Sequence, residues 1–354
     1  MRIGVVGLGQ LARTAHLPLL SRMPAVTVSA ICDSDSEALR RSSLLAPDAV
    51  AFNRFSDLLD SHSVDAVVIS LPSHLHADAA VAAFGAGVHV YLEKPIASKI
   101  PDARRILNSW IESGKVGMIG HNYRFHPLVT KLRRQIRAGV IGRPTSAHTR
   151  FATPAPRRDS WRSTRESGGG ALLDLAVHHV DLLRFLLDTE IASASARIES
   201  RQTEHDAATL RLTTVSGVSA DVDVAFGESF KDRLEVRGET GTLWIDLAHS
   251  VDVGTGRFDG RIGLTSRISA YLPTPRRVLY FASRHRSPSH EPSFELALSA
   301  FVEAAASGEG RKPDLHDGFA ALAVIDAAER SALSGQPVSV GEWKGAGPAS
   351  PRVE

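Results

Sequence analysis

The 354-residue sequence predicts an α/β chain of two units, a parallel sheet with crossover helices followed by an α+β unit with a large, mostly antiparallel sheet. Short apolar runs alternate with helical stretches up to about residue 120, and from about residue 145 turn residues separate runs with period-2 alternation. Single cores seldom grow past roughly 250 residues, which also favours two domains. The expected boundaries are 1–120 and 121–340, with a flexible tail at 341–354.

The first unit is predicted from five Val- and Ile-rich runs, which fit parallel strands buried on both faces. In order they are "RIGVVG", "VTVSAICD", "AVVISLP", "HVYLEKP" and "GMIGHN".

The second unit is predicted from the runs "TSAHTRF", "SASARIES", "AATLRLTT", "SADVDVAF", "DRLEVRGE" and "GTLWIDL". A helix is expected over 293–306, with a Ser cap and one apolar face, and another over 316–333. The arginine-rich stretch 254–290 is expected to be an excursion used for subunit contact or for covering the pocket, with a solvated basic loop as the alternative.

Composition excludes several classes of function. The 41 basic and 39 acidic residues are well mixed and leave a net charge of +2, so neither nucleic acid nor a membrane surface is an expected partner. The single cysteine, Cys32, rules out an internal disulfide and a multi-cysteine zinc site, and no metal is expected. The N-terminal run lacks the character of a signal peptide, so a cytoplasmic location is expected.

A glycine loop follows the first predicted strand. "GVVGLGQLA" places Gly7, Gly9 and Ala12 as G-x-G-x-x-A between a strand and a helix, the context of a Rossmann dinucleotide-binding turn. Asp33, at the end of the second strand, can accept hydrogen bonds from ribose hydroxyls and would repel a 2′-phosphate. NAD is therefore the expected cofactor, although such a turn also occurs in other α/β proteins.

The stretch "GGGALLDLAVHHVD", residues 168–181, combines glycines with ionisable side chains. In an α-helix starting near Ala171, Asp174, His178 and Asp181 fall within roughly 60° of one another and form a polar stripe beside leucines. The glycines would let the chain pass close to cofactor or substrate. An ordinary core helix with a satisfied histidine is the alternative.

"YLEKPIA", followed about eighty residues later by D-x-x-x-H, resembles the Gfo/Idh/MocA family of oxidoreductases. The likeness extends over "LPSHLHADAAVAAFGAGVHVYLEKP" and "NYRFHPLVTKLRRQIRAGVIGRP". It implies that Lys94, Asp174 and His178 are catalytic, and that an open sheet in the second domain forms a homodimer or homotetramer interface. Ala176 stands where members of the family usually have glycine.

The expected cofactor contacts lie in the glycine loop, at the second strand and on the segments that carry the resemblance: Gly7, Gly9, Gln10, Leu11, Ala12, Asp33, Leu71, Pro72, His76, Glu93 and Lys94. The expected substrate contacts are Tyr123, Arg124, Trp161, Asp174 and His178. Ordinary packing remains the alternative for Arg124, Trp161 and also His126.

Oxidation of a secondary alcohol needs a base for the hydroxyl proton while hydride leaves carbon. His178 suits the base, Asp174 can orient its imidazole, and Lys94 can polarise the oxygen or relay the proton. His179 points away from the stripe and is expected to be structural. A surface lysine paired with Glu93 is the alternative for Lys94.

The sequence thus predicts an NAD-dependent dehydrogenase acting on a secondary alcohol of a sugar, amino sugar or cyclitol, in antibiotic or secondary sugar metabolism. One alternative is a glycoside hydrolase that uses bound NAD for transient oxidation and elimination. The other is a non-catalytic nicotinamide-sensing regulator, which would be expected to lack the Lys, Asp and His set.

Overall fold

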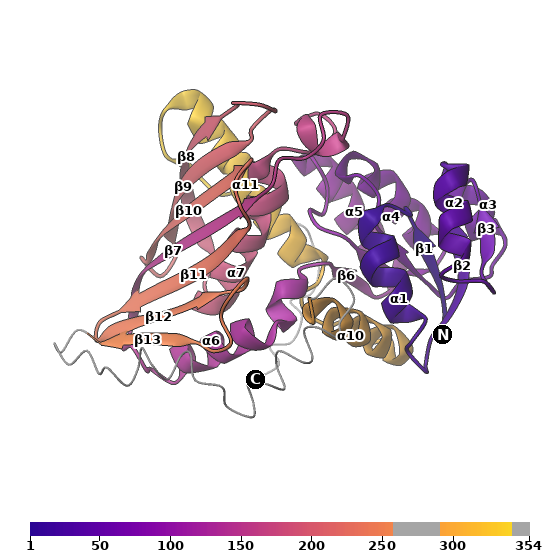
Figure 1. Ribbon diagram of the computed structural model, residues 1–354, viewed down its shortest axis with the longest axis horizontal. Coiled ribbons are helices and arrows are strands. Elements are labelled where there is room, and N and C mark those ends of the chain that lie inside the picture. Colours follow the sequence, from indigo (N-terminus) through magenta and orange to yellow (C-terminus); the bar gives the residue numbers. More distant parts are fainter. Residues whose placement is uncertain (258–290, 342–354) are drawn as a thin grey trace.

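The computed structural model describes residues 1–257 and 291–341. Within these residues the chain forms two sheets, each covered by helices, and Figure 1 shows them on opposite sides of the molecule. The described helices include none that is long and apolar enough to cross a membrane.

The first sheet is parallel and has the strand order β3-β2-β1-β4-β5-β6, which confirms the predicted Rossmann fold. Its strands are β1 (Arg2–Val6), β2 (Thr27–Cys32), β3 (Val50–Phe52), β4 (Ala66–Ile69), β5 (His89–Leu92) and β6 (Gly117–Ile119). All of β4 is buried, as expected for a central strand covered on both faces.

The helical elements of this half are η1 (Ala12–His16), α1 (Leu17–Leu20), α2 (Ser36–Ser43), α3 (Phe55–Asp60), η2 (Ser73–Leu75), α4 (His76–Gly85) and α5 (Ile100–Ser113). The element η1 is a π-helix that continues into α1. The sheet therefore presents the carboxyl ends of β1, β2, β4 and β5 to the loops that carry the glycine motif, Asp33 and Lys94.

The second sheet has the order β13-β12-β11-β7-β10-β9-β8-β14 and is antiparallel except for the parallel pair β7 and β10. The strands are β7 (Pro144–Thr153), β8 (Ile191–Glu199), β9 (Ala207–Thr214), β10 (Ser219–Phe226), β11 (Lys231–Gly238), β12 (Gly241–Asp246), β13 (Gly254–Arg257) and β14 (Val338–Ser339). Each of the six predicted runs matches a strand of this sheet to within one residue at its end, so the mostly antiparallel prediction is confirmed.

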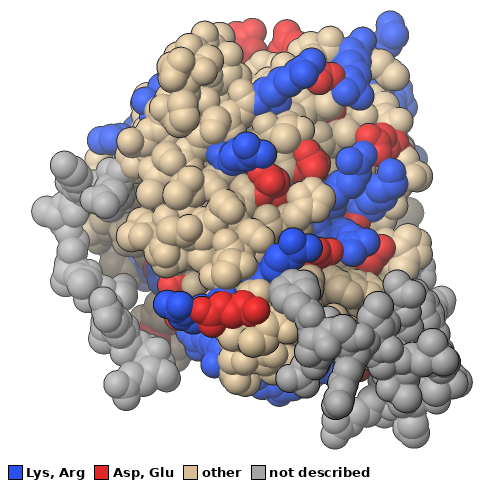
Figure 2. Space-filling model, turned by 90° about the vertical axis from the view of Figure 1, so that its left-hand side faces the viewer, with Lys and Arg blue, Asp and Glu red and all other residues tan. Residues whose placement is uncertain are grey.

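Helices pack on one face of the second sheet. They bury alternate residues of its strands, such as Leu210, Leu212 and Val222. The helical elements of this half are η3 (Asn122–Phe125), α6 (Pro127–Arg137), η4 (Trp161–Ser163), η5 (Leu172–Ala176), α7 (Val177–Leu187), α10 (Ser293–Ser307) and α11 (Leu315–Ser334). The other face carries cross-strand pairs such as Arg211 with Asp221. Figure 2 views the molecule from the side of this sheet and shows acidic and basic side chains scattered over a broad uncharged surface.

The helices predicted at 293–306 and 316–333 are present, but the predicted Ser cap is wrong. Pro292 is the N-cap residue of α10, and Ser293 is fully buried inside its first turn. The Ser293 hydroxyl accepts a hydrogen bond from Asn122 Nδ2 at 2.7 Å, so a distant partner has replaced the local one.

The helix α10 returns to the first sheet although it comes late in the chain. Leu298 and Phe301 are fully buried in the same apolar cluster as Ile3 and Val5, and Phe301 packs edge-on against Tyr91. The predicted division at residue 120 stays a prediction. Of the predicted excursion 254–290, the first four residues form β13, and residues 258–290 lie outside the described residues, as does the predicted tail after residue 341.

Candidate active site

The glycine loop has the geometry that a dinucleotide needs. Gly7 has φ +83°, and a Cβ there would lie 2.6 Å from the carbonyl oxygen of Ser70. A Cβ on Gly9 would meet nothing within 4 Å, which leaves its backbone open to a pyrophosphate, while Ala12 is fully buried. Gln10 is exposed and Leu11 is half-buried where the helix begins.

Asp33 lies directly beside this loop. Its Oδ2 accepts a hydrogen bond from the Leu8 backbone N–H at 2.7 Å, and its Oδ1 accepts one from Asp35 at 2.9 Å. A half-buried carboxylate next to an open glycine turn fits the ribose end of NAD. The residues present therefore match the group that the fold implies.

His76 joins two of the predicted cofactor segments. Its Nδ1 lies 2.8 Å from the Pro95 carbonyl oxygen and its Nε2 lies 2.8 Å from that of Leu71. Burial lowers the pKa of His76, and the neutral ring carries its single N–H on one of the two nitrogens, so it donates to only one of these carbonyl oxygens. His76 thus links the end of β4 to the loop that carries Lys94, and Leu71 and Pro72 beside it are half-buried.

Glu93 is buried rather than paired with Lys94 through its side chain. Its Oε1 lies 3.0 Å from His16 Nε2, although neither atom has the alignment of a hydrogen bond. Its other oxygen accepts a long hydrogen bond from the Lys94 backbone N–H at 3.3 Å. The Lys94 ammonium is consequently free to reach the second half of the chain.

Lys94 meets Asp174 across the two halves. The ammonium donates hydrogen bonds to Asp174 Oδ1 at 2.7 Å and to the Asp174 carbonyl oxygen at 3.0 Å. Arg162 Nε donates to the other carboxylate oxygen, Oδ2, at 2.7 Å. Burial raises the pKa of Asp174, but Lys94 and Arg162 outweigh that effect and lower it to about 2. Asp174 is therefore an anion held between two cations.

His178 lies beside this ion cluster against an aromatic wall. Its ring centroid is 5.0 Å from that of Tyr123 and 5.8 Å from that of Phe151. Burial, followed by the positive charge of Lys94, lowers the pKa of His178 well below 6.5. Its Nδ1 is buried and has no hydrogen-bond partner among the described residues. The imidazole is therefore neutral at neutral pH and able to accept a proton.

The structure differs from the expected arrangement in one contact. Both oxygens of Asp174 are engaged by Lys94 and Arg162, so Asp174 holds the lysine and not the His178 imidazole. The cause is local: residues Leu172–Ala176 form the π-helix η5, whose wider turns change the phase that an α-helix would give to Asp174 and His178. Ala176 is fully buried in the core.

The three glycines before this helix let protein segments converge. A Cβ on Gly168 would lie 2.7 Å from Ser73, one on Gly169 would lie 2.4 Å from the Arg162 backbone, and one on Gly170 would lie 3.0 Å from His205. Gly168 and Gly170 also have positive φ. They therefore allow close contacts between protein segments at the start of η5, and the expected contacts of this loop with cofactor or substrate stay a prediction.

Replacing Gly169 by alanine should lower the free energy of unfolding by about 1–3 kcal/mol, because the new methyl group overlaps the Arg162 backbone. Chemical denaturation measures this. Gly310→Ala is the control, since a Cβ there meets nothing within 4 Å, and its effect should stay within about 0.5 kcal/mol. Equal stability of the two variants would contradict the close approach.

The remaining predicted substrate residues have separate surroundings. Arg124 donates to Asp181 at 2.8 and 2.6 Å and to Asp317 at 3.1 Å, and only 9% of its side chain is exposed. His126 caps α6 by accepting a hydrogen bond from the Leu128 N–H. Trp161 is half-buried and precedes Arg162. The structure thus brings Tyr123 to His178 and gives Arg124 and His126 protein partners.

The sequence analysis missed Arg162, the second partner of Asp174, and Asp232, the partner of His179. Arg162 carries no local signal that separates it from the many other arginines, apart from the glycines that follow it. His179 Nε2 lies 3.0 Å from Asp232 Oδ1, with both side chains fully buried, and its ring stacks on Phe151 at 5.2 Å.

Comparisons with known proteins extend over both halves. Residues 1–121 match the family described as "Oxidoreductase family, NAD-binding Rossmann fold", and residues 129–244 match the "GFO/IDH/MocA C-terminal domain". The chain is 31% identical to inositol 2-dehydrogenase 1 of Saccharopolyspora erythraea, over 96% of both chains. It is 30% identical to a dTDP-3,4-didehydro-2,6-dideoxy-α-D-glucose 3-reductase of Streptomyces violaceoruber, over 93% of both chains.

Among solved structures, this chain is similar along nearly its whole length to the following one. It is KijD10, a 3-ketoreductase from Actinomadura kijaniata in complex with NADP and TDP-benzene. The sequence identity is 27%, the TM-score is 0.78, and the match covers 94% of this chain and 97% of that one.

Proposed function

Because this chain belongs to the GFO/IDH/MocA family of oxidoreductases with an NAD-binding Rossmann fold, we propose that it interconverts a secondary alcohol and a ketone on a sugar, amino sugar or cyclitol, with NAD as the cofactor. The observation that carries the proposal is the contact of Lys94, at the edge of the first sheet, with Asp174 beside a neutral His178. The relatives named for inositol and for a deoxysugar support the substrate class.

The cofactor, when bound by the glycine loop and Asp33, supplies the hydride acceptor at the nicotinamide C4. Lys94 donates a hydrogen bond to the substrate oxygen and stabilises negative charge on it. Asp174 holds the Lys94 ammonium in place by two hydrogen bonds. His178 accepts the hydroxyl proton, and the rings of Tyr123 and Phe151 limit the access of water to it.

The direct experiment is a panel of sugars, cyclitols and amino sugars with NAD, followed at 340 nm, the absorbance of NADH. NADH formed in proportion to ketone product supports the proposal. Cleavage of a glycoside without net NADH would instead identify the NAD-dependent hydrolase. Binding of NAD with no turnover of any member would identify the regulator.

The pH profile of alcohol oxidation should be flat near neutral pH and fall only well below pH 6.5. The reason is that the lowered pKa of His178 keeps the ring neutral, and therefore basic, until the pH drops through that lowered value. Measurement of kcat/KM from pH 5 to 9 tests this, because the range extends on both sides of the pKa of an unperturbed histidine. An acid limb centred at or above pH 6.5 would contradict the assignment of His178.

NAD should be preferred over NADP by about tenfold or more in kcat/KM, because a 2′-phosphate would lie against the Asp33 carboxylate. Steady-state kinetics with both cofactors and one substrate give the ratio. Equal or better use of NADP would overturn the role given to Asp33.

We further propose a homodimer or homotetramer in the cytoplasm, formed through the face of the second sheet that the described helices leave open. The broad uncharged surface of Figure 2 supports this use.

A further inference from the structure

Asp174 has two positive partners, although it carries only one negative charge. Lys94 Nζ donates to Asp174 Oδ1 at 2.7 Å and to the Asp174 carbonyl oxygen at 3.0 Å. Arg162 Nε donates to the other carboxylate oxygen, Oδ2, at 2.7 Å, and Arg162 Nη2 donates to the same oxygen. The reaction proposed above uses Lys94, Asp174 and His178. The cluster therefore holds one cation, Arg162, that the reaction has not yet used.

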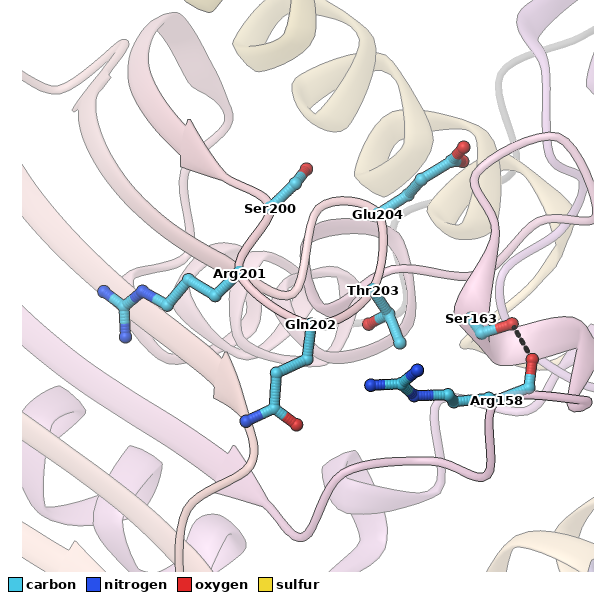
Figure 3. A pocket seen from close by; sticks show the side chains of 7 residues that line it. All are labelled: Arg158, Ser163, Ser200, Arg201, Gln202, Thr203 and Glu204. Carbon is cyan, nitrogen blue, oxygen red and sulfur yellow. Dashed lines mark hydrogen bonds between the residues drawn. The ribbon is translucent and has the colours of Figure 1, made fainter.

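Arg162 lies in the short helix η4, whose backbone is fixed on both sides. The Arg162 carbonyl oxygen accepts a hydrogen bond from the Gly170 N–H at 3.0 Å. The Ser163 hydroxyl donates to the Arg158 carbonyl oxygen at 2.9 Å, the bond drawn in Figure 3, and the Ser163 carbonyl oxygen accepts from the Glu204 N–H at 3.1 Å. The backbone that presents Arg162 therefore has little freedom to move away from Asp174.

The guanidinium of Arg162 is also held from the side. Its central carbon lies 5.1 Å from the centroid of the Phe226 ring at the end of β10, which is within the distance of a cation–π contact. Phe226 is buried, whereas 34% of the Arg162 side chain is exposed. An arginine keeps its positive charge under all conditions in which proteins function. Arg162 is therefore a placed and permanent cation.

The segment that carries Arg162 is bonded to the loop that carries Lys94. Arg165 Nη2 donates to the Ser98 carbonyl oxygen at 3.0 Å and to Glu329 Oε2 of α11 at 3.0 Å. Ser98 follows Lys94 in the loop between β5 and α5. The two cations therefore stand on segments that are joined to each other and to the same helix of the second half.

The contact of Arg162 affects how many donors of Lys94 remain for a substrate. A lysine ammonium has three N–H donors, and Asp174 accepts from it at two positions. A carboxylate with an open second oxygen would attract the third donor as well. In this site the second oxygen already accepts two hydrogen bonds from Arg162. The third donor of Lys94 is therefore left for another acceptor.

Arg162 also supports the ionised state of Asp174. Burial raises the pKa of Asp174, whereas the charges of Lys94 and Arg162 lower it to about 2. When Lys94 stabilises negative charge on a substrate oxygen, two anions share its single positive charge. A buried carboxylate without a full counterion is unfavourable, and Arg162 provides that counterion throughout the reaction.

We propose that Arg162 is a positioning residue of the reaction and acts through Asp174. It occupies one carboxylate oxygen and supplies a permanent counterion, so that Lys94 keeps one donor for the substrate oxygen. The inference rests on the proposed function, because it takes Lys94 to be the group that meets the substrate. It adds to the predicted set a fourth residue, which touches neither the substrate nor the cofactor.

Arg162→Gln is expected to lower kcat by about 10- to 100-fold with little change in KM, because Lys94 is held less firmly. Arg162→Lys restores a cation and should recover part of the loss. Arg157→Gln is the matched control and should keep the full kcat, because Arg157 lies in the same segment, is 85% exposed and pairs with Asp159. A raised KM with unchanged kcat in Arg162→Gln would show direct binding of substrate by Arg162 and would overturn the inference.

The pH profile separates positioning from a merely structural role. Asp174 and His178 must both be deprotonated in the reaction, and the charge of Arg162 lowers the pKa of each. Without that charge both pKa values rise, so the acid limb of kcat/KM should move to higher pH in Arg162→Gln and stay in place in Arg162→Lys. The other groups that lower the pKa of His178 are unchanged in these variants: Lys94, His121 and His179. An acid limb that stays in place in Arg162→Gln would contradict the inference.

The double variant Arg162→Gln/Asp174→Asn shows whether Arg162 acts through Asp174. In the Asp174→Asn background, Arg162→Gln should cause little further loss of kcat, because the carboxylate that it holds is already gone. Losses that multiply would show a separate role and would overturn the inference. The melting temperatures of the same four proteins should also be non-additive, and they need no substrate. If these temperatures are coupled but no member of the panel is turned over, the proposed function fails and the contact of Arg162 is structural only.

Discussion

Lys94→Met is expected to lower kcat by roughly 10²- to 10⁴-fold, the range for loss of a positioned proton-transfer group or charged donor. The ammonium that makes two hydrogen bonds with Asp174 is removed, and the substrate oxygen loses its positive partner. Initial rates of NADH formation at saturating substrate measure the loss. NADH should still bind through the glycine loop and Asp33, and any fall in its affinity measures the expected contact of Lys94 with the cofactor.

Lys99→Met is the control for this variant. Lys99 is exposed just before α5, and its ammonium has no side-chain partner within the described residues. It should retain the full kcat. If Lys94→Met also retained it in a folded protein that binds NADH, Lys94 would have no part in the reaction.

His178→Ala is expected to lower kcat by a similar factor, roughly 10²- to 10⁴-fold, because the neutral base against Tyr123 and Phe151 is lost. NADH affinity should be unchanged and the melting temperature nearly so. Steady-state rates, NADH fluorescence titration and thermal unfolding together give the three quantities.

His179→Ala separates the two adjacent histidines. It leaves the carboxylate of Asp232 buried without its partner, so it should reduce stability by about 3–5 kcal/mol and affect turnover less. Loss of turnover in a folded, NAD-binding His179→Ala protein, with activity kept in His178→Ala, would show that the assignment of the two rings is reversed.

The sequence predicted the first sheet because its signals are local. Gly7 adopts a positive φ that favours glycine, Ala12 is small enough for its buried position, and Asp33 follows a strand of typical β composition. Each signal can be read from a few neighbouring residues of the sequence. The second sheet was equally accessible, since alternation along β9 and β10 follows directly from burial of one face.

The contacts of Asp174 were not accessible in the same way. Its pairing with Arg162 depends on a segment without regular periodicity, brought close by Gly169, and Asp174 itself lies in the π-helix η5, where α-helical spacing does not apply. Neither a loop path nor an i→i+5 turn leaves a periodic pattern in the residues. Ser293 illustrates the same limit, because a distant asparagine occupies the hydroxyl that local rules assign to a cap.

The central claim is that Lys94 and His178 serve a single proton transfer, and the kcat of the double variant Lys94→Met/His178→Ala tests it most directly. With a substrate found in the panel, the four rates of the unmodified, single and double variants are measured at saturating NAD and substrate. The account predicts that the double variant is little slower than the slower single variant, because either change already disables the same step. A loss equal to the product of the two single losses would show independent roles and would contradict it.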